Sequence, residues 1–494
     1  MSKTVNSTQE ATITEVGYVT SLKNYLLVLN GLPNAKINEI IVNQNGVRAI
    51  VTSLKDSSIE ALLLDNEEIQ PNEMFSRTFK QLNVDVGPHL LGRMIDPLGI
   101  PIDGKQRFPK SNTTLPLNSV AGGIKTRQFI KQPFETGIIK VDMLVPIAKG
   151  QREMVIGSAR SGKTSFIIDT IINQKNSKSP VICVYALIGK PLVEVRRIID
   201  TLSVNKALDY TVVVSTASSD PASMIYLTPF VAMTIAEYFQ RQARDILLVL
   251  DDLGTHAKFY REISLLGSRT PGRESYPADV FSQHAALIER AGNFLPEYGG
   301  GSITALPLIE TGLDDYASFI PTNLMAMTDG HLMFNSSLYH KGVRPAVDIP
   351  LSVSRVGRQT QTVLEKRLAD RVKSTLAQAT KLEALSRFGS EVSAETQNLL
   401  NQGKSVTAIL NQAALTKVPR TAQVALLALV FTKFFDGKGD DFVENCKQKV
   451  ISYFTGNEAK LTPEIAKMQD ENQLITYISS LVPELEKTCQ QYKT

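Results

Sequence analysis

The sequence has no tryptophan, few cysteines and little net charge. Its three cysteines, Cys183, Cys446 and Cys489, lie far apart, so we expect neither a disulfide framework nor a metal pattern, and we expect a reducing cytoplasm. A net charge of +4 on 494 residues gives no argument for nucleic-acid binding. The N-terminus lacks the apolar core of a signal peptide, and the apolar run 424–431 is far shorter than the roughly 20 residues of a membrane span. We therefore expect the chain to reach a membrane only through partners.

The most informative stretch is IGSARSGKTSF at 156–166, which has the spacing G-x-x-x-x-G-K-T. The glycines of such a loop let backbone N–H groups surround phosphate oxygens, the lysine adds a charge, and the threonine hydroxyl holds Mg²⁺. EMVIG before the loop predicts a strand, and SFIIDTIINQ after it predicts a helix. The motif predicts nucleotide binding and does not predict hydrolysis. The predicted binding residues are Gly157, Ser158, Ala159, Arg160, Ser161, Gly162, Lys163, Thr164 and Ser165.

A second nucleotide element is DILLVLDDLG, in which a carboxylate follows an apolar strand downstream of the P-loop. Asp251 would reach Mg²⁺ through water, beside Thr164. The alternative is that the two acidic residues only begin a helix, with an aspartate as its N-cap.

The apolar pattern changes twice along the chain. Residues 11 to about 85 predict strands, with Asn45-Gly46 as a hairpin signal, and favour a small β-barrel or sandwich. Apolar runs at 180–189, 210–218 and 245–254 then alternate with helical stretches, as in a doubly wound parallel sheet. From residue 363 onward the pattern is helical.

We therefore predict a multidomain chain: an N-terminal β-barrel at 1–85, a central α/β P-loop (RecA-like) nucleotide-binding domain at 86–364, and a C-terminal α-helical bundle at 365–494. Within the last part we expect helix breaks at Gly403, Pro419, Gly437, Gly456 and Pro463.

Further motifs resemble the rotary ATPase alpha and beta subunits. Residues 342–357 contain P-A-V-D-x-x-x-S-x-S, from Pro345 to Ser354. The blocks LLGRMIDPLGIPIDGK, TGIIKVDMLVPIAKGQRE and RTPGRESYPADVFSQHAALIERA look like those of F-type ATP synthase alpha subunits. The resemblance spans roughly residues 12–420. It implies ATP or ADP with Mg²⁺, catalytic beta-type and central gamma-type partners, and a cytoplasmic complex peripheral to the membrane; it also allows a stalk subunit.

The position of one lysine favours a non-catalytic subunit. Catalytic beta-type subunits carry a glutamate, in a GER sequence, where this chain has Lys190. An ammonium group cannot act as a base toward water unless it is strongly desolvated. Glu194 lies four residues further on, where its geometry would differ. The resemblance therefore implies nucleotide binding without useful hydrolysis.

Arg355, in SVSRVG, stands where alpha subunits present an arginine finger to the catalytic site of a neighbouring beta subunit. The alternative is an ordinary interface ion pair. By the same resemblance, Tyr339, Arg344 and Pro345 would line the adenine side and Gln412 would reach in from the helical part. The alternatives are core packing for Tyr339 and a solvated helix position for Gln412.

The chain departs from the family in two places. The family loop GDRQTGKT is here GSARSGKT, so neither nucleotide affinity nor a preference for adenine over guanine is carried over from the family. Only a short polar lead precedes the barrel-like sequence, and we expect that the complex either contacts its stator differently or has no stator of the usual kind. Our main hypothesis is a regulatory alpha-type subunit alternating with beta-type subunits in a hexamer. The alternatives are a self-sufficient homohexameric P-loop ATPase and an alpha-like subunit of a rotary machine that does work other than ion transport.

Overall fold

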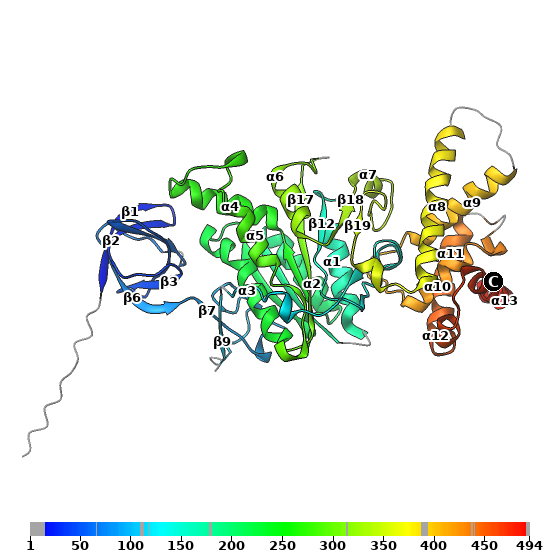
Figure 1. The fold of residues 1–494 in the computed structure, drawn as a ribbon, viewed down its shortest axis with the longest axis horizontal. Coiled ribbons are helices and arrows are strands. Elements are labelled where there is room, and N and C mark those ends of the chain that lie inside the picture. Colours follow the sequence, from blue (N-terminus) through cyan, green and yellow to red (C-terminus); the bar gives the residue numbers. More distant parts are fainter. Residues whose placement is uncertain are drawn as a thin grey trace, which may run out of the picture.

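The computed structural model describes residues 15–490 apart from 66, 109–112, 118, 177–179, 313–314, 387–393, 436–437 and 439. Three bodies follow one another along its longest axis: a β-barrel, a central domain built on a parallel sheet, and a helical domain (Figure 1). The predicted fold class is confirmed. Gly437 and the polar lead at residues 1–10 lie outside the described residues.

The barrel closes in the order β1-β2-β5-β4-β3-β6. The predicted hairpin at Asn45-Gly46 joins β3 to β4, and Gly46 has a φ of 86°, which suits its turn. The barrel strands are β1 (Val16–Lys23), β2 (Leu26–Gly31), β3 (Glu39–Asn43), β4 (Arg48–Leu54), β5 (Ser58–Leu63) and β6 (Met74–Gln81).

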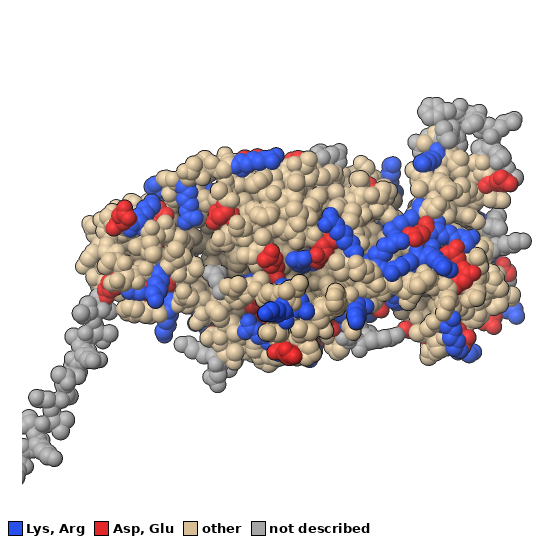
Figure 2. Space-filling view, viewed as in Figure 1, with Lys and Arg blue, Asp and Glu red and all other residues tan. Residues whose placement is uncertain are grey.

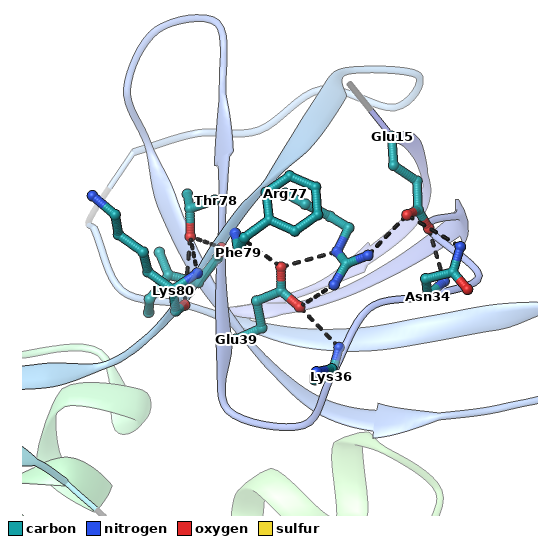
Figure 3. A network of polar contacts seen from close by, with 9 residues as sticks. Glu15, Asn34, Lys36, Glu39, Arg77, Thr78, Phe79 and Lys80 are labelled. Carbon is teal, nitrogen blue, oxygen red and sulfur yellow. Dashed lines mark hydrogen bonds and ion pairs between the residues drawn. The ribbon is translucent and has the colours of Figure 1, made fainter. Parts of the chain in front are cut away.

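A buried ion network joins two of these strands (Figure 3). Arg77 of β6 donates two hydrogen bonds of 2.9 Å each to the carboxylate of Glu39 on β3, and a further 2.9 Å bond to Glu15. Glu39 also accepts the backbone N–H groups of Lys36 and Phe79. Because both carboxylates are paired and hydrogen-bonded, these charges are accommodated inside the barrel wall.

The central sheet has nine strands, with the path β19-β18-β12-β17-β15-β13-β14-β8 and β16 beside β17. All neighbours from β18 to β8 along this path run parallel. The strands are β8 (Met94–Ile95), β12 (Glu153–Ser158), β13 (Val181–Lys190), β14 (Thr211–Ala217), β15 (Asp245–Asp251), β16 (Gly292–Asn293), β17 (Ser302–Thr311), β18 (Gly330–Phe334) and β19 (Val353–Ser354). The shorter pairs are β7 (Asn83–Asp85) with β9 (Thr114–Pro116), and β10 (Pro133–Phe134) with β11 (Ile147–Ala148).

Both faces of this sheet are covered, as the continuous apolar runs predicted. Alternate residues of β13 divide between two cores: Cys183, Tyr185 and Leu187 pack with α1 and α2, whereas Ile182 and Val184 pack with α3, α4 and α5. The helices of this domain are α1 (Lys163–Ile172), α2 (Leu192–Val204), α3 (Ala222–Gln240), α4 (Leu253–Leu266), α5 (Val280–Ile288), α6 (Phe319–Met327) and α7 (Ser336–His340).

Helix α3 is long and apolar enough to cross a membrane by length and composition alone. However, 89% of its most apolar window is buried inside the domain, and it packs on β13, β14 and β15. Its hydrophobicity therefore belongs to the core. The sequence shows no long apolar run at α3, because Tyr226, Thr228 and Pro229 interrupt its apolar residues.

The C-terminal part consists of α8 (Val363–Ser386), α9 (Ala394–Leu410), α10 (Arg420–Leu429), α11 (Asp440–Gly456), α12 (Glu458–Ala466) and α13 (Glu471–Gln490). Pro419 caps α10 and Gly456 ends α11, as predicted. The breaks predicted at Gly403 and Pro463 are wrong: Gly403 lies inside α9 against Ala379 of α8, and Pro463 lies inside α12. Close packing of α9 on α8 outweighs the low helix propensity of Gly403, whereas Pro463 is exposed.

The expectation about the cysteines is also wrong in part. Cys446 of α11 and Cys489 of α13 form a disulfide with a Cα–Cα distance of 5.5 Å, and Cys183 is a buried free thiol. The pairing could not be predicted from the sequence, because the two cysteines are 43 residues apart and only the packing of α11 on α13 brings them together.

Charged side chains of both signs cover this domain. On the face shown in Figure 2, Lys and Arg side chains gather where the helical domain meets the central domain, with acidic side chains among them. Ion pairs at this part of the chain join Arg358 to Asp370 at 2.8 Å and Arg371 to Glu471 at 3.5 Å. Positive charge is therefore balanced locally.

Candidate functional site

The P-loop joins β12 to α1 at the carboxyl edge of the sheet, where the parallel strands end. Two glycines explain its course. A Cβ on Gly157 would lie 2.5 Å from the carbonyl oxygen of Phe334, and Gly162 has a φ of 95°, which side chains disfavour. The backbone can therefore turn tightly against β18 and begin α1 with its N–H groups facing the loop.

Lys163 is held by the loop itself. Its ammonium donates to the carbonyl oxygens of Gly157 at 2.8 Å and Ser158 at 2.7 Å, and it lies 3.9 Å from the Glu310 carboxylate. Burial lowers the pKa of Lys163, against the charges of Glu310 and Asp251. The lysine is thus placed at the mouth of the loop, where phosphate oxygens would bind.

A cavity of about 680 Å³ opens in front of the loop. Residues from Ala159 to Ser165 line it, whereas Gly157 and Ser158 are buried behind them and only hold Lys163. The remaining lining residues are Gly189, Lys190, Pro191, Val193, Glu194, Arg197, Asp251, Asp252, Thr255, Glu310 and Tyr339.

Asp251 ends β15 inside this cavity, as the strand–carboxylate pattern predicted. The N-cap alternative holds for the next residue: Asp252 caps α4 and accepts the N–H of Thr255 at 2.6 Å. Both carboxylates line the cavity, but Asp252 is also the N-cap of α4, whereas Asp251 is not.

Lys190 forms an ion pair with Asp251. The Nζ of Lys190 lies 2.7 Å from Oδ1 of Asp251 and 3.6 Å from Asp252, and the hydroxyl of Tyr185 donates to Oδ2 of Asp251 at 2.9 Å. Burial by itself lowers the pKa of Lys190, but the charges of Asp251 and Asp252 outweigh it and raise that pKa above its usual value. Lys190 is therefore a charged ammonium and not a base.

The same contacts bear on Mg²⁺. Thr164 lines the cavity, as a metal ligand should. Asp251 has both carboxylate oxygens engaged by Lys190 and Tyr185 and is only 2% exposed. Among the residues that the structure describes, no group of three or more His, Cys, Asp or Glu side chains could hold a metal. The donor set expected for Mg²⁺ thus fits at Thr164 and does not fit at Asp251.

A second cavity, of about 210 Å³, shares Tyr339 with the first and brings together the side chains expected around the base. Tyr339, Arg344, Pro345 and Gln412 all line it. The Arg344 guanidinium lies 3.5 Å from the centre of the Tyr339 ring and donates to the Tyr339 carbonyl at 2.6 Å. The two cavities are adjacent, because Gly162, Ser165 and Tyr339 line both of them.

Gln412 is neither solvated nor free. It is 6% exposed, accepts the N–H of Ile139 at 3.0 Å, and donates to the carbonyl oxygens of Gly137 and Thr416. Its amide therefore links the helical domain to the segment before the P-loop. Gln412 also lines the base-side cavity, but its amide groups are already hydrogen-bonded within the protein.

Arg355 lies elsewhere. It follows β19, whose Ser354 pairs with Gly330 at the start of β18, and Gly330 pairs with Glu153 at the start of β12. Arg355 is therefore at the amino edge of the sheet, about 17 Å from the P-loop edge at roughly 3.3 Å per residue of β12. Its side chain is exposed and lines neither cavity.

Sequence reasoning did not single out three residues that complete the site. Tyr185 orients Asp251, Glu310 faces Lys163 at the end of β17, and Asp169 of α1 lines the base-side cavity and accepts the N–H of Leu415 at 2.9 Å. Glu310 was detectable, because it is a carboxylate that ends an apolar strand of the same sheet. Tyr185 and Asp169 carried no comparable signal, since both lie within apolar runs.

Comparison with known proteins matches two family models to this chain. The model described as "ATP synthase alpha/beta family, nucleotide-binding domain" matches residues 137–354, and "ATP synthase alpha/beta chain, C terminal domain" matches residues 361–484.

Curated relatives match over nearly the whole length. "ATP synthase subunit alpha" of Mycoplasma pneumoniae is 41% identical over 92% of this chain and 87% of its own. The protein of the same name from Mycoplasma capricolum is 39% identical over 99% of this chain and 94% of its own. The protein of the same name from Lactobacillus delbrueckii is 40% identical over 94% of this chain and 92% of its own.

Proposed function

Because this chain belongs to the ATP synthase alpha/beta family, as an alpha-type subunit, we propose that it binds ATP or ADP without hydrolysing it and presents Arg355 to catalytic sites of its neighbours. In this proposal it alternates with beta-type subunits in a hexameric ring around a gamma-type shaft. The nucleotide bound by this chain is then structural and regulatory.

One observation carries the non-catalytic role: the ammonium of Lys190 lies 2.7 Å from Asp251, at the position expected for a catalytic base. A general base must accept a proton from the attacking water, and a charged ammonium has no lone pair for it. Glu194, in the first turn of α2, must also be tested, because it lines the same cavity and, unlike Glu310, has no ion pair with Lys163 among the described residues.

The role of Arg355 in trans is supported by its place. An exposed guanidinium at the sheet edge opposite the P-loop cannot serve the nucleotide of its own chain, but it can reach a site on an adjacent subunit. Its planar donors suit the spread of charge over a phosphoryl group in transfer, and such fingers contribute roughly 10³–10⁵ in rate.

The proposed ligand is ATP or ADP, with its phosphates at residues 159–165 and its base beside Tyr339 and the Arg344–Pro345 segment. Arg160 lines the phosphate cavity with a φ of 58° and adds a positive charge there. Of the two side chains expected at Mg²⁺, Thr164 is the one available.

We further propose a cytoplasmic position, peripheral to the membrane and held there by partner subunits, including a stalk subunit. A disulfide such as Cys446–Cys489 is uncommon in a reducing compartment. The thiol state of these two cysteines in freshly lysed cells therefore tests this location: free thiols agree with it, and a complete disulfide contradicts it.

The deciding experiment measures ATP hydrolysis by the purified full chain, alone and after assembly with a beta-type partner. We expect no hydrolysis by the chain alone and hydrolysis by the assembly. Glu194→Gln is expected to leave both results unchanged. Turnover by the chain alone that disappears in Glu194→Gln would instead favour a self-sufficient P-loop ATPase.

A further inference from the structure

The phosphate cavity already contains a fixed cation. Lys190 ends β13 with its side chain 12% exposed, and the parallel register that pairs Leu187 with Asp251 places its Nζ against the end of β15. The ammonium contacts Asp251 at 2.7 Å and Asp252 at 3.6 Å. One ammonium of the protein itself therefore faces both carboxylates and directly balances the charge of Asp251.

The remaining contacts hold this arrangement in place. Tyr185 occupies the second oxygen of Asp251, while Asp252 is committed to the N–H and hydroxyl of Thr255 at 2.6 and 3.0 Å. An ammonium has three donors, and the hydrogen bond to Asp251 uses one of them, while Asp252 at 3.6 Å attracts the same charge. Lys190 also lines the cavity that faces Lys163 and Thr164, so it lies within the space where phosphates would bind.

Mg²⁺ would compete with this ammonium. The ion requires near-octahedral oxygen coordination and is usually held through one or two carboxylates together with phosphates and water. Here the carboxylate is engaged by a lysine, and a divalent ion beside that lysine would meet a like charge at close range. Admitting the metal would break a buried ion pair, which is strongly unfavourable when one partner is left alone.

We propose that Lys190 takes the place of Mg²⁺ at this site, so that the chain binds a nucleoside di- or triphosphate with little dependence on a divalent cation. The proposal rests on the nucleotide-binding function proposed above. Lys163 and Lys190 then face the phosphates from two sides, and the Thr164 hydroxyl bonds a phosphate oxygen directly.

The test measures ADP and ATP affinity of the purified full chain, with Mg²⁺ and with EDTA, by isothermal titration calorimetry. We expect the affinity of the unmodified chain to change by less than about threefold between the two conditions. For Lys190→Gln we expect EDTA to weaken binding by more than about tenfold, because the freed carboxylate now needs the metal.

Lys190→Arg keeps the charge and is expected to behave as the unmodified chain does. Lys149→Gln is the matched control: Lys149 forms a 2.7 Å ion pair with Asp245 at the other end of β15, outside the cavity. We expect it to leave the metal dependence unchanged. Thermal unfolding of each variant identifies any that fails to fold, and the measurement on the unmodified chain needs no variant.

Mn²⁺ in place of Mg²⁺ supplies a direct readout, because its electron paramagnetic resonance signal reports the metal bound beside the nucleotide. We expect no protein-bound Mn²⁺ signal with the unmodified chain and ADP, and a signal with Lys190→Gln. Loss of more than about tenfold in affinity when the metal is removed from the unmodified chain overturns this inference alone. No nucleotide binding under either condition overturns the proposed function as well.

Discussion

The phosphate cavity and the surface around Arg355 lie at opposite edges of one sheet, and their charged side chains are held in opposite ways. In the cavity, Lys163 is buried and Lys190 is largely buried, and both are partnered by carbonyl oxygens or carboxylates of the same chain. Arg355 is exposed, and no ion pair or side-chain hydrogen bond of its guanidinium is found within the part of the chain that the structure describes. The cavity is lined by residues of one chain, whereas the proposed role of Arg355 requires a neighbouring subunit.

We expect the largest effect, a loss of ATP hydrolysis by the assembled complex, from substitution of Arg355, the residue proposed to act in trans. We expect Arg355→Lys to lower ATP hydrolysis by the assembled complex by roughly 10³-fold or more, since a lysine cannot place planar donors on the phosphoryl oxygens. Nucleotide affinity of this chain should not change. Steady-state hydrolysis and calorimetry on the same preparations measure both.

Arg358→Lys is the matched control for that measurement, because Arg358 is exposed nearby and pairs with Asp370 of α8. We expect it to retain normal turnover. Near-normal turnover by Arg355→Lys would refute the role in trans.

The second prediction is the reverse of the first: nucleotide binding by this chain should fall while hydrolysis by the complex stays nearly unchanged. We expect Lys163→Ala to weaken nucleotide binding by this chain about 10- to 100-fold, the value of a hydrogen bond to a charged group, because the P-loop charge is lost. If the catalytic sites lie mostly on other subunits, as proposed above, hydrolysis by the complex should stay within about threefold of its original rate. Lys341→Ala, which removes an exposed lysine, serves as the control. Equal loss of binding and hydrolysis would mean that this cavity is itself catalytic.

Gln412 tests how far the cavity depends on the helical domain. We expect Gln412→Ala to lower the free energy of unfolding by about 1–3 kcal/mol, because the N–H of Ile139 and two carbonyl oxygens lose a buried partner. Urea unfolding measures this change. Gln397→Ala, on the exposed side of α9, should cost less than about 0.5 kcal/mol. A Gln412 variant as stable as the control would show that the tie between the domains is dispensable.

The smallest effect concerns pH at the base-side cavity. Burial raises the pKa of the Asp169 carboxyl to about 6. The folded chain then binds this proton more tightly than the unfolded chain, so stability is full at low pH and falls as the pH rises through 6. Asp169→Asn keeps an acceptor for Leu415 and has no proton to lose.

We therefore expect the Asn variant to match the unmodified chain near pH 4 and to exceed it by about 1 kcal/mol at pH 8, discounted for partial exposure of the carboxyl. Thermal unfolding at several pH values measures the difference. A constant difference across this range would contradict the assignment of the titration to Asp169.

Local pattern was sufficient for most of the fold. The strand, loop and helix around Gly157–Thr164, the hairpin at Asn45-Gly46 and the strand that ends at Asp251 all lie where alternation and motif spacing predicted them. Predictions from single residues were weaker. Gly403 and Pro463 do not break helices; at Gly403, close packing of α9 on α8 outweighs the residue's propensity.

The site was predicted less completely. The P-loop residues came from motif spacing, while Tyr339, Arg344, Pro345 and Gln412 came from family resemblance, and all four line one cavity. Pattern alone did not identify Tyr185 or Asp169, because each lies in an apolar run and becomes functional only through a contact with a distant segment. The Cys446–Cys489 pair was missed for the same reason.

The sequence by itself determined the elements and the chemistry available to them, because hydrophobic period, turn residues and motif spacing act over a few neighbouring residues. Only the tertiary structure decided which charges meet. Lys190 and Asp251 end different strands, and the sheet register brings them within 2.7 Å, the contact on which the proposed replacement of a metal by an ammonium rests. The same sheet carries Arg355 to the opposite edge, out of reach of its own nucleotide.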